Sequence, residues 1–493
     1  MFEQYLNSIG EYGIISQIQH PLITIRGLPQ AHPNEMLIFE NGQIGMVYDI
    51  DEKSLHALIF SQTPASLGSK VTRTNITMAI PASENLLGRI IDPLTNIMSA
   101  SSTAKYVQEQ PQMRDLFIPA PGISRRVPIT SQFLTGVSKV DLLIPLGYGQ
   151  RELIMGDVKT GKTMFLSRTI INQVKNHDSI VIYAAIGKKR TEIITLYEYF
   201  QKEGIIDKIC IVATTASDIA STIYLTPYTA ITLAEFFRDK GQNVLVVMDD
   251  LTTHAQRYRE IALKSRRFPG RESFPGDIFY THASLLERAG HFTHETTGTV
   301  SITCLPVAMT TEGDITGYIS TNLMSMTDGH IFFDSAIYNK GERPAINIPL
   351  SVTRVGRQAQ SQLGKEINKT ILSTMTEYEK IKNIAYIGSE LSEVSKSILK
   401  KGESLMNLLN QDMLIDLPYE LQLVLFGLVW INELDLSSNK SYNMMIPELM
   451  KIYTDENRLG EVRLLLDSPT MKDFLDGLKK NQQLINICKI VKQ

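Results

Sequence analysis

A glycine-bracketed loop, GDVKTGKT, occupies residues 156–163 directly after the apolar run at 152–156. Such glycines let the backbone wrap round phosphate oxygens, and the N-terminus of a following helix adds positive potential. The Lys162 ammonium would reach the β- and γ-phosphates, and the Thr163 hydroxyl would bind Mg²⁺. The pattern predicts an ATP (or ADP) and Mg²⁺ site that contains Gly156, Asp157, Val158, Lys159, Thr160, Gly161, Lys162 and Thr163.

A second polar group follows another apolar run. Residues 243–248 are Asn-Val-Leu-Val-Val-Met, and Asp249 and Asp250 come next. In P-loop proteins, a carboxylate at the end of such a strand holds the magnesium ion. An apolar run that ends in aspartate is common by itself, but the loop about ninety residues upstream makes Asp249 the candidate for this role.

Several elements must position these residues. Apolar runs at 152–156, 179–187, 208–216, 243–250 and 299–307 alternate with helical stretches, which predicts a parallel sheet covered on both faces. Short β-like runs before residue 78 predict a small barrel or sandwich. From residue 361, apolar residues recur at helical spacing, among them Ile381, Ala385 and Gly388, and then Leu405, Leu408 and Leu409. We therefore expect a multidomain α/β protein with a small β domain at 1–78, a nucleotide-binding domain at 79–360 and a helical domain at 361–493.

The composition limits the classes of function. The formal net charge of −3 does not suggest a nucleic-acid binder, which usually carries a basic surface. Cys210, Cys304 and Cys488 are far apart in apolar contexts and suit buried thiols in a reducing compartment. No signal peptide is recognisable, and the apolar run at 423–431 is shorter than the roughly 20 residues of a membrane span. We expect a cytoplasmic protein that meets the membrane only indirectly, through partner subunits.

Longer stretches around these motifs carry a family resemblance. TGVSKVDLLIPLGYGQRELIMGDVKTGKT, LLGRIIDPL, APGISRR, GRESFPGDIFYTHASLLERAG, TDGHIFFD and RPAINIPLSVTRVG resemble F-type ATP synthase alpha subunits, collinearly from about residue 13 to 435. The resemblance implies a β-barrel crown, a RecA-like P-loop domain and a C-terminal helical domain. It also implies a hexamer that alternates with beta-type catalytic subunits around a central gamma-type shaft.

The residues also depart from the catalytic members of that superfamily. Those members carry a glutamate that polarises the attacking water in a Gly-Glu-Arg sequence after the strand that follows the P-loop helix. Here Gly187 is followed by Lys188, where alpha subunits usually have glutamine. An ammonium cannot accept a proton from water, and losing general-base help costs about 10²- to 10⁴-fold in rate. We expect a chain that binds ATP without hydrolysing it, and we further hypothesise that Lys188 pairs with the γ-phosphate and locks ATP in place.

The resemblance assigns roles to other residues. In the family, an arginine within Ser-Val-Ser-Arg-Val-Gly reaches the nucleotide of the neighbouring beta subunit, and Arg354 occupies that place here. Such a finger suits charge that develops on a transferring phosphoryl group. Ser325 and Val352 match family residues at the same interface. The residues that match the adenine pocket are Tyr338, Arg343, Pro344 and Gln411, while Met413 replaces a second glutamine and Val158 and Lys159 replace the usual arginine and glutamine.

Other functions remain open from the sequence. A homohexameric export-type ATPase would need the catalytic glutamate, and a Rho-like helicase would need a basic RNA-binding domain with stacking aromatic residues. A structural protein with a vestigial P-loop would not be expected to retain Lys162, Thr163 and Asp249. The short segment before Gly13, where the family has a stator-docking helix, suggests a variant rotary ATPase whose head drives surface or gliding machinery instead of a proton channel.

Overall fold

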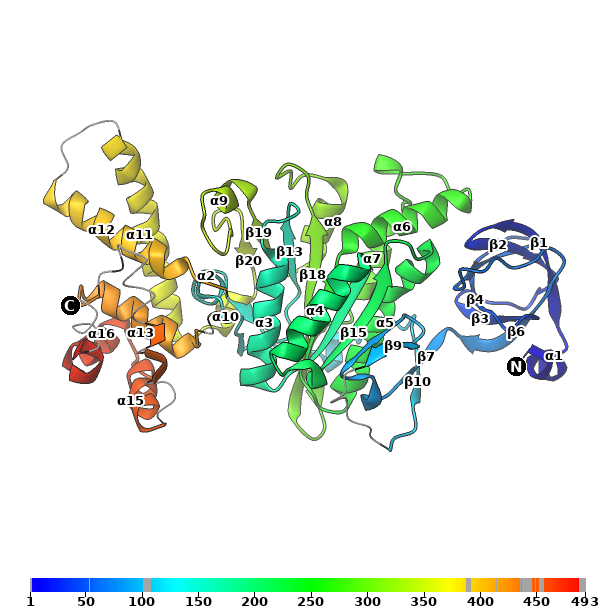
Figure 1. Cartoon of the computed structure of the whole chain (residues 1–493), viewed down its shortest axis with the longest axis horizontal. Coiled ribbons are helices and arrows are strands. Elements are labelled where there is room, and N and C mark those ends of the chain that lie inside the picture. Colours follow the sequence, from blue (N-terminus) through cyan, green and yellow to red (C-terminus); the bar gives the residue numbers. More distant parts are fainter. Residues whose placement is uncertain are drawn as a thin grey trace. The chain divides into compact units, whose positions relative to one another are not determined.

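The N-terminal strands close into a barrel in the order β1-β2-β5-β4-β3-β6 (Figure 1). After helix α1 (Phe2–Ile9), these strands are β1 (Tyr12–Gln19), β2 (Leu22–Arg26), β3 (Glu35–Phe39), β4 (Ile44–Ile50), β5 (Leu55–Ile59) and β6 (Lys70–Thr77). Neighbouring strands pair antiparallel, and apolar side chains such as Ile15, Leu37 and Val71 fill the interior. Full closure leaves no unpaired strand edge.

The computed structural model describes residues 2–52, 54–100, 108–386, 392–413, 415, 417–434, 436, 446–447, 449–451 and 456–486. Two compact units can be distinguished. The first contains Met1–Pro128, Gly149–Met155 and Val174–Asp328, and the second contains Ile129–Tyr148, Gly156–Gln173 and Gly329–Gln493.

A largely parallel sheet forms the centre of the first unit. Its strand order is β13-β18-β16-β14-β15-β8-β9, and β17 pairs with β18. The bounds are β8 (Arg89–Ile91), β9 (Ile97–Ala100), β13 (Glu152–Gly156), β14 (Ile180–Lys188), β15 (Ile209–Thr215), β16 (Val244–Asp249), β17 (Gly290–His294) and β18 (Gly298–Met309). A separate pair consists of β7 (Ala79–Ala82) and β10 (Gln112–Asp115).

The central strands are buried on both faces, as their uninterrupted apolar sequences require. Every residue of β16 is buried, as are the first seven of β14. Helices flank this sheet: α4 (Arg190–Lys202), α5 (Ala220–Asp239), α6 (Leu251–Lys264), α7 (Ile278–Leu286) and α8 (Tyr318–Met326). All five apolar runs that the sequence singled out are strands, within two residues at each end.

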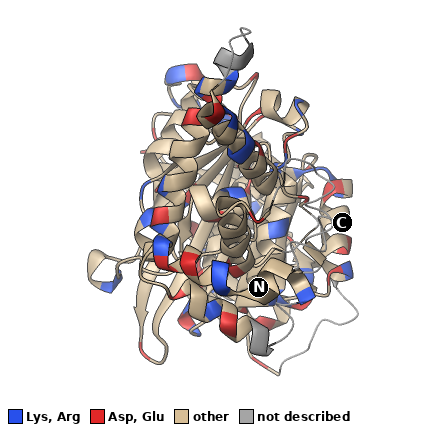
Figure 2. Cartoon of the chain, turned by 90° about the vertical axis from the view of Figure 1, so that its left-hand side faces the viewer, with Lys and Arg blue, Asp and Glu red and all other residues tan. Residues whose placement is uncertain are grey.

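The second unit combines short strands with the C-terminal helices. Its elements are β11 (Gln132–Phe133), α2 (Ser138–Leu143), β12 (Leu146–Gly147), α3 (Lys162–His177, which ends in the first unit), β19 (Gly329–Phe333), α9 (Ser335–Asn339), β20 (Val352–Thr353), α10 (Gly356–Ala359), α11 (Gln362–Tyr386), α12 (Glu393–Leu409), α13 (Tyr419–Trp430), α15 (Glu456–Leu466) and α16 (Met471–Lys480). In the view of Figure 2, basic and acidic residues are interspersed along the helices.

The expected fold class is confirmed: a β-barrel precedes a nucleotide-binding domain with a parallel sheet, and helices follow. The boundaries at residues 78 and 360 stay predictions. Cys210 and Cys304 are buried free thiols, as expected, whereas Cys488 and Gly388 lie outside the described residues. Within the described part of the chain, no helix is both long and apolar enough to cross a bilayer.

Candidate nucleotide-binding site

The loop at 156–163 has the backbone conformation that its glycines predict. Gly156 has φ +149°, and a Cβ atom there would lie 2.3 Å from the carbonyl oxygen of Phe333. Gly161 has φ +96°, a region that L side chains rarely adopt. The loop joins the end of β13 to the first turn of α3, which is the strand–loop–helix order of phosphate-binding loops.

Side chains of the loop bond within the loop itself. Lys162 is 7% exposed, and its Nζ donates to the carbonyl oxygens of Gly156 at 2.7 Å and Asp157 at 2.5 Å. The Thr160 hydroxyl donates to the same Asp157 carbonyl at 2.8 Å. Thr163 is exposed on the first turn of α3. The ammonium is therefore held over the loop by two backbone carbonyl oxygens.

The predicted base-binding residues come together in the second unit. The Arg343 guanidinium carbon lies 3.6 Å from the centre of the Tyr338 ring, and Nη1 donates to the Tyr338 carbonyl at 2.8 Å. A Cβ on Gly161 would lie 3.9 Å from Cε2 of Tyr338, so the ring borders the phosphate loop. Arg343 therefore covers one face of the Tyr338 ring, and stacking of a base on this ring stays a prediction.

Gln411 has a different environment from the one expected of a base-reading amide. Its side chain is fully buried, its Oε1 accepts from the Ser138 amide at 2.9 Å, and its Nε2 donates to the Gly136 carbonyl at 2.9 Å. Its backbone N–H donates to the Arg343 carbonyl at 2.8 Å. Gln411 thus links the chain at Arg343 to the start of α2, and direct contact with adenine stays a prediction.

The acidic strand end lies in the first unit. Strands β14 and β16 are parallel neighbours, and Ala185 is paired with Asp249. This register brings the Lys188 ammonium to 2.6 Å from Oδ1 of Asp249 and 3.1 Å from Oδ2 of Asp250. The other Asp249 oxygen accepts from the Tyr183 hydroxyl at 2.7 Å. Lys188 and Asp249, which the sequence assigned separately, are thus in direct contact.

Electrostatics fix the protonation of this group. Burial alone would lower the pKa of Lys188, but the charges of Asp249 and Asp250 outweigh burial and hold that pKa above its ordinary value. Burial, reinforced by the Asp249 charge, raises the pKa of Tyr183 well above its usual range. Lys188 is therefore a permanent cation at neutral pH and Tyr183 a permanent donor.

The interface candidates are exposed. Arg354 and Val352 flank the buried Thr353 at the end of β20, and the Thr353 hydroxyl donates to the Pro145 carbonyl at 2.8 Å. Ser325 is exposed on α8 and its hydroxyl donates to the Asn322 carbonyl at 2.7 Å. This hydrogen bond anchors Thr353, and therefore the backbone from which the exposed Arg354 side chain extends.

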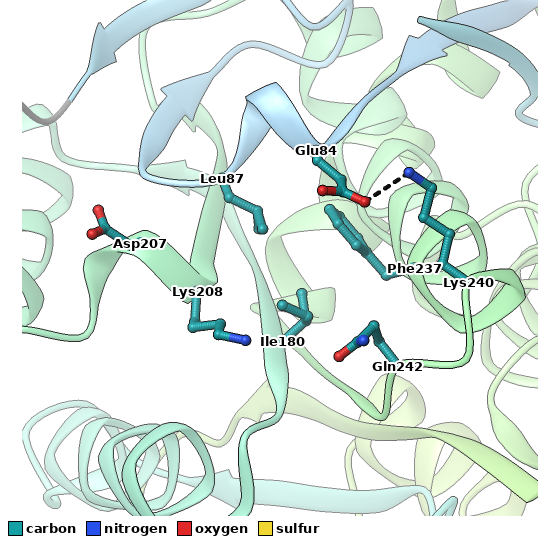
Figure 3. Close-up of a pocket in the computed structure, with 8 residues that line it drawn as sticks. All are labelled: Glu84, Leu87, Ile180, Asp207, Lys208, Phe237, Lys240 and Gln242. Carbon is teal, nitrogen blue, oxygen red and sulfur yellow. Dashed lines mark hydrogen bonds and ion pairs between the residues drawn. The ribbon is translucent and has the colours of Figure 1, made fainter. Parts of the chain in front are cut away.

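A separate cavity of about 480 Å³ lies at the opposite strand ends (Figure 3). Ile180 begins β14, and Lys208 and Gln242 precede β15 and β16. Lys240, which also lines the cavity, is already paired with Glu84 at 2.8 Å and Lys208 with Asp178 at 3.0 Å. Parallel α/β sheets bind ligands at the carboxyl ends of their strands, so this cavity is a poor candidate for the nucleotide.

The sequence did not identify two residues of the acidic group. Tyr183 is the only hydroxyl-bearing residue in the apolar run at 180–186. A single hydroxyl in a buried strand indicates a polar partner nearby, so Tyr183 could have been predicted to contact a polar group. Asp250 was noted only as a neighbour of Asp249. In the structure Asp250 caps the N-terminus of α6: its Oδ1 accepts from the Thr253 amide at 2.7 Å, while Oδ2 faces Lys188. No sequence pattern indicates which carboxylates a lysine on the adjacent strand contacts.

Comparisons with known proteins agree with this geometry. Residues 136–353 match the nucleotide-binding domain of the ATP synthase alpha/beta family, and residues 360–458 match the C-terminal domain of ATP synthase alpha/beta chains. The chain is 34% identical to ATP synthase subunit alpha of Aquifex aeolicus over 95% of this chain and 94% of that protein. It is 36% identical to ATP synthase subunit alpha of Neorickettsia sennetsu over 99% of this chain and 95% of that protein.

A barrel, a parallel sheet and a glycine-bracketed phosphate loop ahead of a helical segment define a nucleotide-binding protein of the ATP synthase alpha/beta class. Within that class, relatedness over nearly the full length is to alpha subunits. The chain belongs to the family of F-type ATP synthase alpha subunits.

Proposed function

We propose that this chain is the non-catalytic alpha-type subunit of a rotary ATPase head. It holds ATP·Mg²⁺ without hydrolysing it and supplies Arg354 to the catalytic site of a neighbouring beta-type subunit. In the complex, ATP hydrolysis or synthesis is coupled to rotation of a central gamma-type shaft. The names of the relatives, ATP synthase subunit alpha, support the assembly part of this proposal.

The observation that carries the non-catalytic role is the state of Lys188. Catalysis of hydrolysis needs a carboxylate that polarises water, and the residue at that place is an ammonium. The two carboxylates beside it, Asp249 and Asp250, are its ion-pair partners at 2.6 and 3.1 Å. Glu192, a further carboxylate on the next helix, is exposed to solvent. The two aspartates are therefore engaged by the ammonium that occupies the catalytic position.

The holding role rests on the loop and the base region. Lys162, Thr163 and the glycine backbone supply phosphate and magnesium contacts, and Tyr338 beside the loop supplies an aromatic face. A magnesium ion bound with nucleotide takes most of its ligands from phosphate oxygens and water, and needs only one or two protein oxygens. Thr163, exposed on the first turn of α3, can supply one such oxygen, and when bound the ion would neutralise phosphate charge. Asp249 stays a sequence-based candidate for a further contact.

The proposal is tested with the purified chain alone and with its complex. We expect the chain alone to retain nucleotide that is detectable after denaturation and to turn over no ATP above background. The complex with a beta-type partner should hydrolyse ATP. Brisk hydrolysis by the isolated chain that disappears in Lys162→Ala would contradict the non-catalytic role.

A further inference from the structure

The contacts of Asp249 and Asp250 engage all four of their carboxylate oxygens. For Asp249, one oxygen faces the Lys188 ammonium at 2.6 Å and the other accepts from the Tyr183 hydroxyl at 2.7 Å. For Asp250, one oxygen accepts from the Thr253 amide at 2.7 Å and the other faces Lys188 at 3.1 Å. The Lys188 ammonium is thus a fixed cation between the two aspartates.

Burial makes this cation effective. The side chains of Asp249 and Asp250 are 10% and 5% exposed, and that of Lys188 is 19% exposed. Charges in such surroundings are screened far less than charges in water, so one ammonium at this distance offsets a large part of the repulsion between the two carboxylates and an approaching polyphosphate. In P-loop proteins, that repulsion is reduced by the bound magnesium ion.

We infer that the Lys188 ammonium takes over part of the charge neutralisation that magnesium provides beside Asp249, so that this chain holds ATP with only weak dependence on Mg²⁺. This inference rests on the proposed nucleotide-holding function. It assigns Lys188 to the carboxylates, whereas the γ-phosphate lock assigns it to the nucleotide.

The two roles of Lys188 lead to different measurements. An internal cation lowers the ratio of ATP affinities measured with Mg²⁺ and with a chelator, and removing it raises that ratio. A phosphate lock contributes to affinity under both conditions, so removing it weakens both affinities and leaves their ratio nearly unchanged.

The experiment measures ATP binding to the nucleotide-depleted full chain by calorimetry, in Mg²⁺ and in excess EDTA. For the unaltered chain, we expect affinities within about tenfold of each other, a difference of about 1.4 kcal/mol. In Lys188→Gln, which restores the family's usual amide, the ratio should increase by about tenfold or more. Lys189→Gln is the matched control, because it removes the same charge from an exposed neighbour and should leave the ratio unchanged.

A second variant covers the case in which Lys188→Gln does not fold. Asp250→Asn keeps a side-chain oxygen that can cap α6 and removes one negative charge. It should reduce the Mg²⁺ dependence below that of the unaltered chain.

Each outcome decides the inference. A large Mg²⁺ dependence in the unaltered chain, or an equal ratio in the unaltered chain and Lys188→Gln, overturns it. An equal loss of affinity in both media favours the phosphate lock and also overturns it. Failure of the unaltered chain to bind ATP in either medium is a different result, because it removes the proposed holding function itself.

Discussion

Glu235 and Arg288 form a fully buried ion pair in the first unit. Glu235 lies on α5, and Arg288 follows α7. The guanidinium donates to both Glu235 oxygens, to the Thr232 hydroxyl at 2.8 Å and to the Leu116 carbonyl at 2.7 Å. A charge at 1% exposure is tolerated only because these partners replace its hydration.

Removing one partner should therefore destabilise the fold by much more than the intact pair stabilises it. Glu235→Ala leaves the guanidinium buried without its counter-charge, and loss of one member of a buried pair costs about 3–5 kcal/mol. We expect unfolding of the full chain at lower urea concentration, followed by circular dichroism. Glu393→Ala, which removes the carboxylate of an exposed pair with Lys396, should change the transition by no more than about 0.5 kcal/mol. Similar transitions for both variants would contradict the prediction.

Residue types alone predicted part of the candidate nucleotide-binding site. The glycine positions of the phosphate loop and the lysine at 188 could be assigned from the sequence because one residue type determines each property. The partners of Lys188 could not, since they depend on the register of β14 against β16, which pairs Ala185 with Asp249. The same limit applies to Gln411, whose amide bonds to Gly136 and Ser138 more than 270 residues earlier in the chain.

At the scale of elements, a histidine pair joins α6 to α7. His254 Nε2 lies 3.1 Å from the Tyr224 carbonyl, which can only accept, so this nitrogen carries the proton. His254 Nδ1, 3.1 Å from His282 Nε2, is then the acceptor. Both rings are fully buried. Burial lowers the pKa of His254 to about 4 and, together with its neighbour, lowers the pKa of His282 well below its usual value.

This pair should make stability depend on pH. Between about pH 6.5 and about 4, the unfolded chain binds protons that the folded pair does not, so stability decreases as pH falls. The slope is at most about 1.4 kcal/mol per pH unit for each histidine. In urea unfolding at pH 7.5, 6 and 5, His254→Gln should show a shallower decrease than the unaltered chain. An unchanged slope in His254→Gln would refute the role of the pair.

Element prediction succeeded where burial leaves a simple pattern. The strands β13, β14, β15, β16 and β18 are continuous apolar runs because both of their faces are covered. The strands β8 and β20 were not identified, since two or three residues carry too little periodicity to distinguish a strand from a loop. Strand β19, which is as long as β13, was not identified either. Their positions are fixed by pairing with partners distant in sequence.

At the scale of the whole molecule, the proposed division of labour separates holding a nucleotide from cleaving one. Lys162 serves the nucleotide that this chain holds, whereas Arg354 serves the nucleotide of its neighbour. Both are cations of a phosphoryl-transfer protein, so a substitution at either would inactivate a self-sufficient ATPase. In an alternating hexamer their effects should differ.

We expect Arg354→Ala, in the complex with a beta-type partner, to reduce ATP turnover by about 10³- to 10⁵-fold, the usual effect of losing an arginine finger. Lys162→Ala should remove nucleotide from this chain while the complex keeps most of its turnover, because the scissile phosphate is held elsewhere. Arg357→Ala, another basic residue just after β20, is the matched control for lost charge. Steady-state ATPase rates and nucleotide content of the three complexes distinguish the cases. Equal inactivation by Lys162→Ala and Arg354→Ala would mean that this chain cleaves its own nucleotide, whereas full turnover in Arg354→Ala would remove the arginine finger from the proposal.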